Sequence, residues 1–112
     1  MKALIQILFS IFFIIAIASH VYFVIVDDGQ PFWWHAIYYI TYGGCWWMLQ
    51  LHNKKALAMY IVLAIFPFVT HANIMFQHYP KLDFLFWIGF IVCIMLIFGV
   101  IWIKKTIVET MV

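Results

Sequence analysis

Four long apolar runs, separated by short polar segments, constrain this chain more than any other feature of its sequence. The runs cover residues 3–26, 32–51, 56–77 and 84–103. Each is about as long as the 20 residues that an α-helix needs to cross the hydrocarbon core of a bilayer. The segments between them are too short for a water-soluble domain. We therefore expect 1–112 to be one all-α integral membrane domain, an antiparallel bundle of four transmembrane helices.

The composition excludes a soluble globular domain. Hydrophobic residues make up 69% of the chain and charged residues only 9%, whereas soluble domains carry roughly a quarter charged residues. A domain this small has too much surface for its volume to hide so many apolar side chains from water. The net charge is only +2 and the lysines are scattered. Because nucleic-acid binding needs a basic surface that neutralises phosphates, we expect membrane lipids as partners and no nucleic acid.

The lysines predict the orientation, since positive residues near the ends of spans stay in the cytoplasm. With the N-terminus inside, only Lys81 lies outside. The other five lysines are then cytoplasmic: Lys2, Lys54, Lys55, Lys104 and Lys105. The sequence therefore predicts an integral protein of a prokaryotic plasma (inner) membrane, with both termini in the cytoplasm.

A cleaved signal peptide is the alternative for the first run. Lys2, an apolar stretch and Ala16-Ile17-Ala18 before Ser19 fit its pattern. The apolar run continues to Val26, however, well beyond the roughly 7–15 apolar residues of a signal peptide. We therefore expect an uncleaved span.

Histidines are the polar groups in the runs that point most directly to a function. No Asp, Glu, Lys or Arg lies within the four runs, which argues against a proton pump or an ion pore with a charged lining. With the predicted orientation, four histidines belong to the outer half of the membrane and only His52 faces the cytoplasm. The candidate cofactor-binding residues are therefore His20, His35, His71 and His78.

Helical periodicity groups the polar side chains into stripes. The stripe of the first run contains Gln6, Ser10, Phe13, Ile17 and His20; that of the second contains His35, Tyr39, Tyr42 and Trp46; and that of the third contains His71, Ile74 and His78. The fourth run has no strong hydrogen-bonding group. We expect the first three stripes to converge inside the bundle and the fourth helix to face mainly lipid or a partner protein.

Two interpretations of the histidines stay open. In one, they bind haem axially, hold copper or zinc together with Met75, or donate hydrogen bonds to a quinone. In the other, there is no cofactor, and the imidazoles bond neighbouring helices or lipid headgroups. For His35 and His78, near the membrane surface, headgroup contact alone is a sufficient explanation.

Proline and glycine predict local features of the second and third runs. Pro67 lies in the middle of the third run, where it removes a backbone hydrogen bond to Leu63 and should kink the helix. Gly43-Gly44 permits close approach of a neighbouring helix. Cys45 and Cys93 lie inside apolar runs without metal-type spacing and are expected to be small buried residues.

Three functions fit these observations. The one we expect is a non-catalytic accessory subunit of a larger membrane protein complex, with other membrane subunits or further copies of this chain as partners. The second is a redox protein that binds haem, a metal or a quinone through the outer-half histidines. The third is a small homo-oligomeric transporter or channel. Enzyme activity of the chain alone is not expected, because no nucleophile–base pair or carboxylate pair occurs at helical spacing.

Overall fold

A computed structural model describes residues 2–110 of the chain, and the side chains of residues 2–109. Its helices are α1 (Lys2–Val26), α2 (Phe32–Leu49), α3 (Lys54–His78) and α4 (Phe84–Thr110), and residues 2–110 contain no strand. The prediction of an all-helical fold is confirmed. Helices α1, α3 and α4 are long and apolar enough to cross a membrane.

Helix α2 differs from the other three in length and composition. It has 18 residues, which corresponds to a length of about 27 Å, and it is richer in tyrosine and tryptophan than any of the other three helices. Its polar side chains face the protein interior. The buried residues of α2 are His35, Tyr38, Thr41, Tyr42, Cys45 and Leu49. This helix therefore supplies much of the interior surface of the fold.

The helix ends differ from the predicted spans mainly at the C-terminus. We expected the fourth helix to end at Ile103, but α4 continues through the lysine pair to Thr110. Lysine is a good helix former, and the buried Thr106 and Ile107 give the added turns a packed side. At the start of α3, Asn53 caps the helix by accepting a 2.8 Å hydrogen bond from the Ala56 N–H group.

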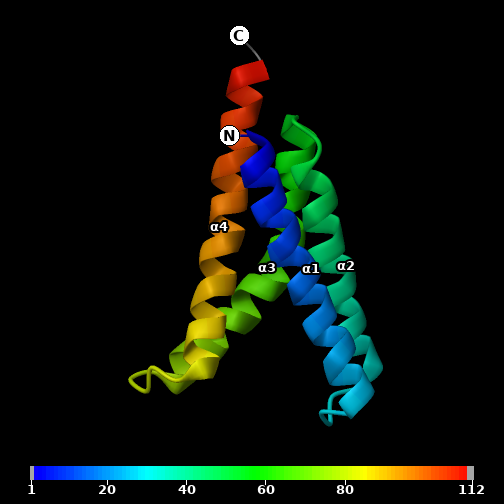
Figure 1. Cartoon of the computed structure of the whole chain (residues 1–112), viewed down its shortest axis with the longest axis vertical. Helices are drawn as coiled ribbons and strands as arrows, with labels where there is room; N and C mark the ends of the chain where they lie inside the picture. The colour runs from blue at the N-terminus through cyan, green and yellow to red at the C-terminus, as the bar shows by residue number, and fades with distance from the viewer. Residues whose placement is uncertain (1, 111–112) are drawn as a thin grey trace.

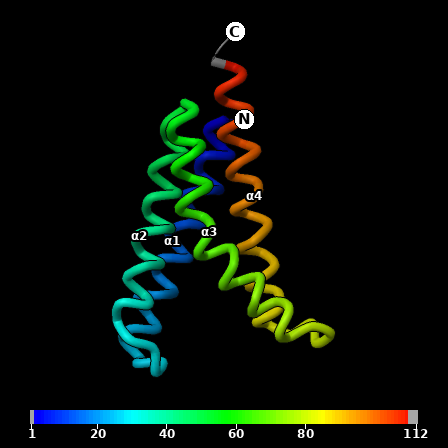
Figure 2. The backbone as a smooth tube through the Cα atoms, turned by 180° about the vertical axis from the view of Figure 1, so that it is seen from behind, coloured from blue at the N-terminus to red at the C-terminus, as the bar shows by residue number. Residues whose placement is uncertain are grey.

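Consecutive helices run antiparallel and form two hairpins, α1–α2 and α3–α4 (Figure 1). All four helices converge at the end that holds both termini, whereas the hairpins diverge toward the opposite end (Figures 1 and 2). The bend in α3 produces this divergence. Pro67 is buried within α3, and beyond the bend α3 leaves α2 and follows α4 (Figure 2). The predicted kink is therefore present.

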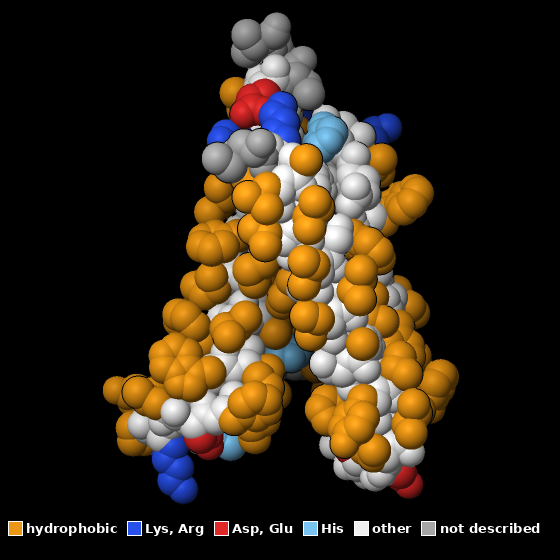
Figure 3. Space-filling model, in the orientation of Figure 1, with side chains coloured by type: hydrophobic (Ala, Val, Ile, Leu, Met, Phe, Trp, Pro, Cys, Tyr) orange, Lys and Arg blue, Asp and Glu red, His pale blue; other side chains and the backbone are white. Residues whose placement is uncertain are grey.

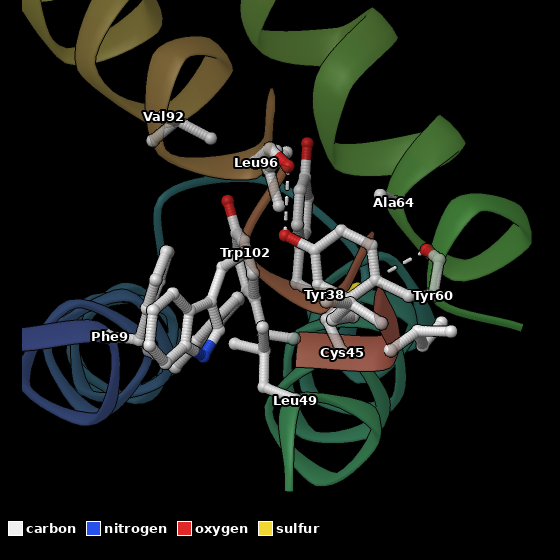
Figure 4. Packing of buried hydrophobic residues seen from close by; sticks show 13 residues of the cluster. Phe9, Tyr38, Cys45, Leu49, Tyr60, Ala64, Val92, Leu96 and Trp102 are labelled. Carbon is white, nitrogen blue, oxygen red and sulfur yellow. Dashed lines mark hydrogen bonds between the residues drawn. The ribbon is translucent and has the colours of Figure 1, made fainter. Parts of the chain in front are cut away.

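The hydrophobic core lies where the four helices converge. Phe9 of α1, Leu49 of α2 and Trp102 of α4 meet there (Figure 4). Tyr60 of α3 is fully buried and donates a 2.9 Å hydrogen bond to the carbonyl of Leu96 in α4. This core closes one end of the bundle.

Helix α4 packs more extensively than its sequence indicated. We expected it to face mainly lipid or a partner, but it lies along α3 and buries Val92, Leu96 and Ile103. Small residues permit this packing: a Cβ atom at Gly89 would meet the backbone of α3 at His71, 2.5 Å from its carbonyl oxygen. The least buried helix is α1, in which only Phe9 and Phe13 are buried.

Candidate functional site

A cavity of about 710 Å³ lies between the two hairpins where they diverge. The hollow is visible in the space-filling view, with a histidine side chain at its inner end (Figure 3). All four helices and the α1–α2 loop line it. Its volume is in the range of small-molecule binding sites, about 300–1,000 Å³. The walls are mostly aromatic and aliphatic. The polar side chains of the lining come from α1, α2, α3 and the α1–α2 loop.

The loop between α1 and α2 brings a carboxylate to this cavity. Asp27 and Gly29 both have positive φ angles, 54° and 87°, which turn the chain sharply after α1. Asp28, between them, lines the cavity and accepts a 3.1 Å hydrogen bond from the Gln30 N–H group. The turn therefore directs a loop carboxylate toward the bundle.

Asp28, His35 and His20 form a continuous hydrogen-bonded chain. His35 Nε2 lies 3.1 Å from Asp28 Oδ1, and His35 Nδ1 lies 3.0 Å from His20 Nδ1. His35 is only 2% exposed. The hydrogen bond from His35 lowers the pKa of the Asp28 carboxyl group below its ordinary value, so Asp28 is ionised at neutral pH.

The ionised carboxylate fixes the donor in the Asp28–His35 link, and the neutral form of His35 fixes the donor in the His35–His20 link. A carboxylate only accepts, so His35 Nε2–H donates to Asp28. Neutral His35 then has a lone pair on Nδ1, and His20 Nδ1–H donates to it. This assignment leaves His20 Nε2 with an unused lone pair at the cavity wall.

Aromatic contacts hold the His20 ring in place. The Tyr38 ring stacks on it, with 4.0 Å between centroids and 14° between planes. Phe23 meets it edge-on at 6.0 Å. These contacts orient His20 between α1 and α2.

A second set of hydrogen bonds connects the hairpins. The Tyr38 hydroxyl of α2 donates to Thr70 Oγ1 of α3 over 2.6 Å. His71, 7% exposed, donates from Nδ1 to the carbonyl of Pro67 over 2.8 Å. Its Nε2 atom therefore carries a lone pair, as in His20. Tyr42 adds a fully buried hydroxyl group with no hydrogen-bond partner among the described residues.

The predicted site residues are only partly brought together. His20, His35 and His71 line the same cavity. His78 does not; it lies at the α3–α4 turn, where its Nδ1 atom is 2.9 Å from Asp83 Oδ2. The expectation of headgroup contact for His35 is wrong, since Asp28 and His20 enclose it.

Comparison of the chain with protein-family models, curated proteins and solved structures gives no match. The chemistry of the site therefore has to follow from its own residues.

A direct hydrogen bond, rather than a cluster of metal ligands, joins His20 and His35. Within residues 2–110, no three His, Cys, Asp or Glu side chains are grouped so as to hold a metal ion. The 3.0 Å separation of the His20 and His35 Nδ1 atoms is a hydrogen-bond length. Haem, copper and quinone binding all stay predictions.

Two residues of the site were missed by the sequence analysis: Asp28 and Tyr38. Asp28 lies between the first two apolar runs, where helical periodicity gives no information. The second-run stripe was drawn through Tyr39, but the buried face of α2 passes through His35, Tyr38, Tyr42 and Cys45. Steps of three, four and three residues already connect these positions, so this stripe was available in the sequence.

The cavity offers a ligand a negative charge and hydrogen-bond acceptors. Of its described lining side chains, Asp28 alone carries a full charge, and neither lysine nor arginine is among them. His20 Nε2 and His71 Nε2 add two lone pairs. Such a lining attracts cations and hydrogen-bond donors and disfavours anions.

Proposed function

We propose that this chain is a four-span membrane protein whose cavity binds a small apolar ligand with a hydrogen-bond donor group, such as a lipophilic alcohol or amine. The observation that carries the proposal is the pair of unused imidazole acceptors, His20 Nε2 and His71 Nε2, in an otherwise largely apolar cavity. A ligand with a donor could give a hydrogen bond to either imidazole. Buried polar groups are normally hydrogen-bonded, and the buried Tyr42 hydroxyl at the same cavity also lacks a partner among the described residues.

The aromatic lining supports the same ligand class. The rings of Phe23, Trp34 and Tyr42 belong to the cavity lining. Such surfaces favour apolar groups, and their π-faces also attract organic cations. The Asp28 carboxylate at the loop favours a positively charged group further. The described lining has no lysine or arginine to attract a ligand that carries a carboxylate or a phosphate.

The orientation in the membrane is part of the proposal. Helices α1 and α3 run in the same direction (Figure 1). If both cross the bilayer, α2 must cross it in the opposite direction between them. The lysines favour both termini in the cytoplasm, so the cavity opens toward the outer side.

The accessory-subunit function is the second candidate. The large uncovered apolar surface of α1, where only Phe9 and Phe13 are buried, favours contact with lipid or with helices of a partner. Mild-detergent purification from the native source, followed by identification of co-purifying chains, tests this function. A monomeric preparation without partner chains would contradict it. Transport and channel functions have less support, because the packed core closes the narrow end of the cavity.

Three probes with the same naphthyl group but different polar groups test which class of ligand the cavity binds. We suggest 2-naphthylethylamine, 2-naphthylethanol and 2-naphthylacetate, measured by equilibrium dialysis against the protein in detergent micelles, with protein-free micelles as the background. We expect the amine and the alcohol to bind and the acetate to bind least. The double variant His20→Phe/His71→Phe should weaken alcohol binding about threefold to tenfold, because the single O–H group donates to one imidazole at a time and one hydrogen bond contributes about 0.5–1.5 kcal/mol.

The matched control is His52→Phe, which replaces a histidine outside this cavity. Its probe binding should equal that of the unmodified protein. Equal partitioning of all three probes with and without protein would contradict the proposal, as would strongest binding of the acetate.

A further inference from the structure

The hydrogen-bonded chain of Asp28, His35 and His20 connects the loop to the inner cavity without a break. Its two links, 3.1 Å and 3.0 Å, are direct hydrogen bonds that need no bridging water. The Asp28 side chain is 28% exposed, whereas the His35 side chain is 3% exposed. The chain therefore leads from a group in contact with the surface, through a buried ring, to a lone pair in the cavity.

We propose that Asp28, His35 and His20 form a proton relay, which takes the proton of an ammonium group bound in the cavity and returns it to the loop side. The inference rests on the proposed function and names its ligand class: a lipophilic amine that arrives as a cation and stays bound as the neutral amine. The Asp28 carboxylate attracts the cation. The apolar interior makes a buried charge costly, so removal of the proton favours deep binding.

The two transfers between residues use hydrogen bonds that are already present. The ammonium N–H gives its proton to His20 Nε2, and the electron pair of that N–H bond stays on the amine nitrogen. His20 then passes its Nδ1 proton to His35 Nδ1. His35 passes its Nε2 proton to Asp28, which releases it to water. The net change is one ammonium ion converted to one amine and one proton in solution. Both rings end in the opposite tautomer, and the reverse series of transfers restores them.

The neighbouring groups are compatible with this direction of transfer. On α2, the titratable neighbours are the phenols of Tyr38 and Tyr42; on α3, the neighbour is His71, whose Nδ1 atom is bonded to Pro67. The loop adds Asp27, next to Asp28. In the described part of α4, the residues that line the cavity carry no titratable group: Phe84, Leu85, Ile88, Ile91 and Val92. The described side chains that line the cavity include no lysine or arginine that would oppose passage of a proton.

The rate of proton release tests the relay. Stopped-flow mixing of the protein with 2-naphthylethylamine, in weakly buffered solution with a pH indicator dye, follows the released proton. We expect Asp28→Asn to slow release at least tenfold, because the amide still accepts the His35 hydrogen bond but cannot take the proton. His35→Gln, which breaks the chain, should slow it similarly. Asp27→Asn is the matched control and should release protons at the rate of the unmodified protein.

The neutral probe separates the relay from binding itself. Binding of 2-naphthylethanol involves no proton transfer, so its rate should be unchanged in Asp28→Asn. Proton release in Asp28→Asn at the unmodified rate would overturn the relay and leave the proposed function intact. Binding of the alcohol without binding of the amine would do the same.

Nitrogen-15 NMR of the histidine rings tests the relay without any ligand. We expect protons on His35 Nε2 and His20 Nδ1 at neutral pH, and no proton on His20 Nε2. A proton on His20 Nε2 in the ligand-free protein would overturn the relay, because that atom could then not accept one. If no probe binds, the proposed function fails, while the tautomers still decide whether the relay is poised as proposed.

Discussion

Gly99 of α4 lies directly against the phenol ring of Tyr60 in α3, at the point where Tyr60 donates its hydrogen bond to the carbonyl of Leu96. A Cβ atom at position 99 would overlap the Tyr60 hydroxyl group. Tyr60 is fully buried, so its ring has little room to move aside. Absence of a side chain at Gly99 thus sets how closely α3 and α4 approach.

Gly99→Ala should therefore lower the free energy of unfolding by about 1–3 kcal/mol, the usual cost of overpacking a core. The control is Gly43→Ala, since a Cβ atom at Gly43 would meet nothing within 4 Å. It should change stability little or raise it slightly, because alanine is the better helix former. Unfolding by denaturing detergent, followed by circular dichroism, measures both. Equal loss in the two variants would contradict the packing described for Gly99.

The hydrogen bond from Tyr38 to Thr70 should stabilise the docking of the two hairpins. Tyr38→Phe and Thr70→Val each remove one partner, and each should cost about 0.5–1.5 kcal/mol. The double variant should cost less than the sum of the two, with a coupling energy of about 1 kcal/mol. The same unfolding assay measures this cycle. Strict additivity would show that the 2.6 Å contact contributes no stability.

Replacement of the buried proline should narrow the angle between the hairpins. In Pro67→Ala, residue 67 regains an N–H group that can bond the Leu63 carbonyl, which favours a straighter α3. Spin labels at the exposed positions Tyr22 and Lys81 would report the separation by electron spin resonance, in a protein with Cys45 and Cys93 replaced by alanine. We expect a shorter distance than with Pro67.

Pro31→Ala serves as the control, because Pro31 precedes the first turn of α2 rather than interrupting a helix. Its label separation should match that of the unmodified protein. An unchanged distance in Pro67→Ala would show that packing against α4, rather than the proline, maintains the bend.

Acid should weaken the start of α4 through Asp83. Its carboxylate accepts a 3.0 Å hydrogen bond from the Phe86 N–H group and pairs with His78. Both contacts lower the pKa of Asp83 below its ordinary value, the Phe86 hydrogen bond most. A lowered carboxyl pKa stabilises the folded state above the unfolded pKa, about 3.9, and this stabilisation is lost as pH falls through the folded pKa.

The measurement compares the unmodified protein with Asp83→Asn between about pH 2 and pH 6. Asparagine still caps the helix but does not titrate. We expect the unmodified protein to lose more stability on acidification than the variant does. Parallel pH profiles would contradict this role of Asp83.

The lysine distribution predicts opposite accessibility for two loops. With both termini in the cytoplasm, a cysteine at position 81 faces outward and one at position 54 faces inward. In the variant without Cys45 and Cys93, a membrane-impermeant maleimide added to intact cells should label Lys81→Cys but not Lys54→Cys. Both should react after permeabilisation. The reverse pattern would invert the proposed orientation.

The helical architecture was predictable because its causes are local. Apolar runs of bilayer length and the polar segments between them specify helices and turns without any knowledge of packing. The Pro67 kink follows in the same way from the missing N–H group. The continuation of α4 past Lys104 depends instead on tertiary burial of Thr106, which charge alone does not reveal.

The cavity was only partly predictable because it depends on contacts between helices. Periodicity placed His20 and His71 on inward-facing stripes. It could not indicate that the turn at Asp27 would direct Asp28 back toward His35. Nor could it separate His78 from the others, since His71 and His78 share a helix face and only the divergence beyond Pro67 distinguishes them. That divergence is also the reason the cavity exists.

The two walls of the cavity come from two consecutive halves of the chain, 2–49 and 54–110, joined by one short link. His20 and His35 belong to the first half, and His71 belongs to the second. Neither half alone contains both imidazole acceptors. Binding of a ligand that contacts both therefore reports that the two halves have docked. Co-expression of the two halves as separate fragments would regenerate the site only if the fragments assemble with each other.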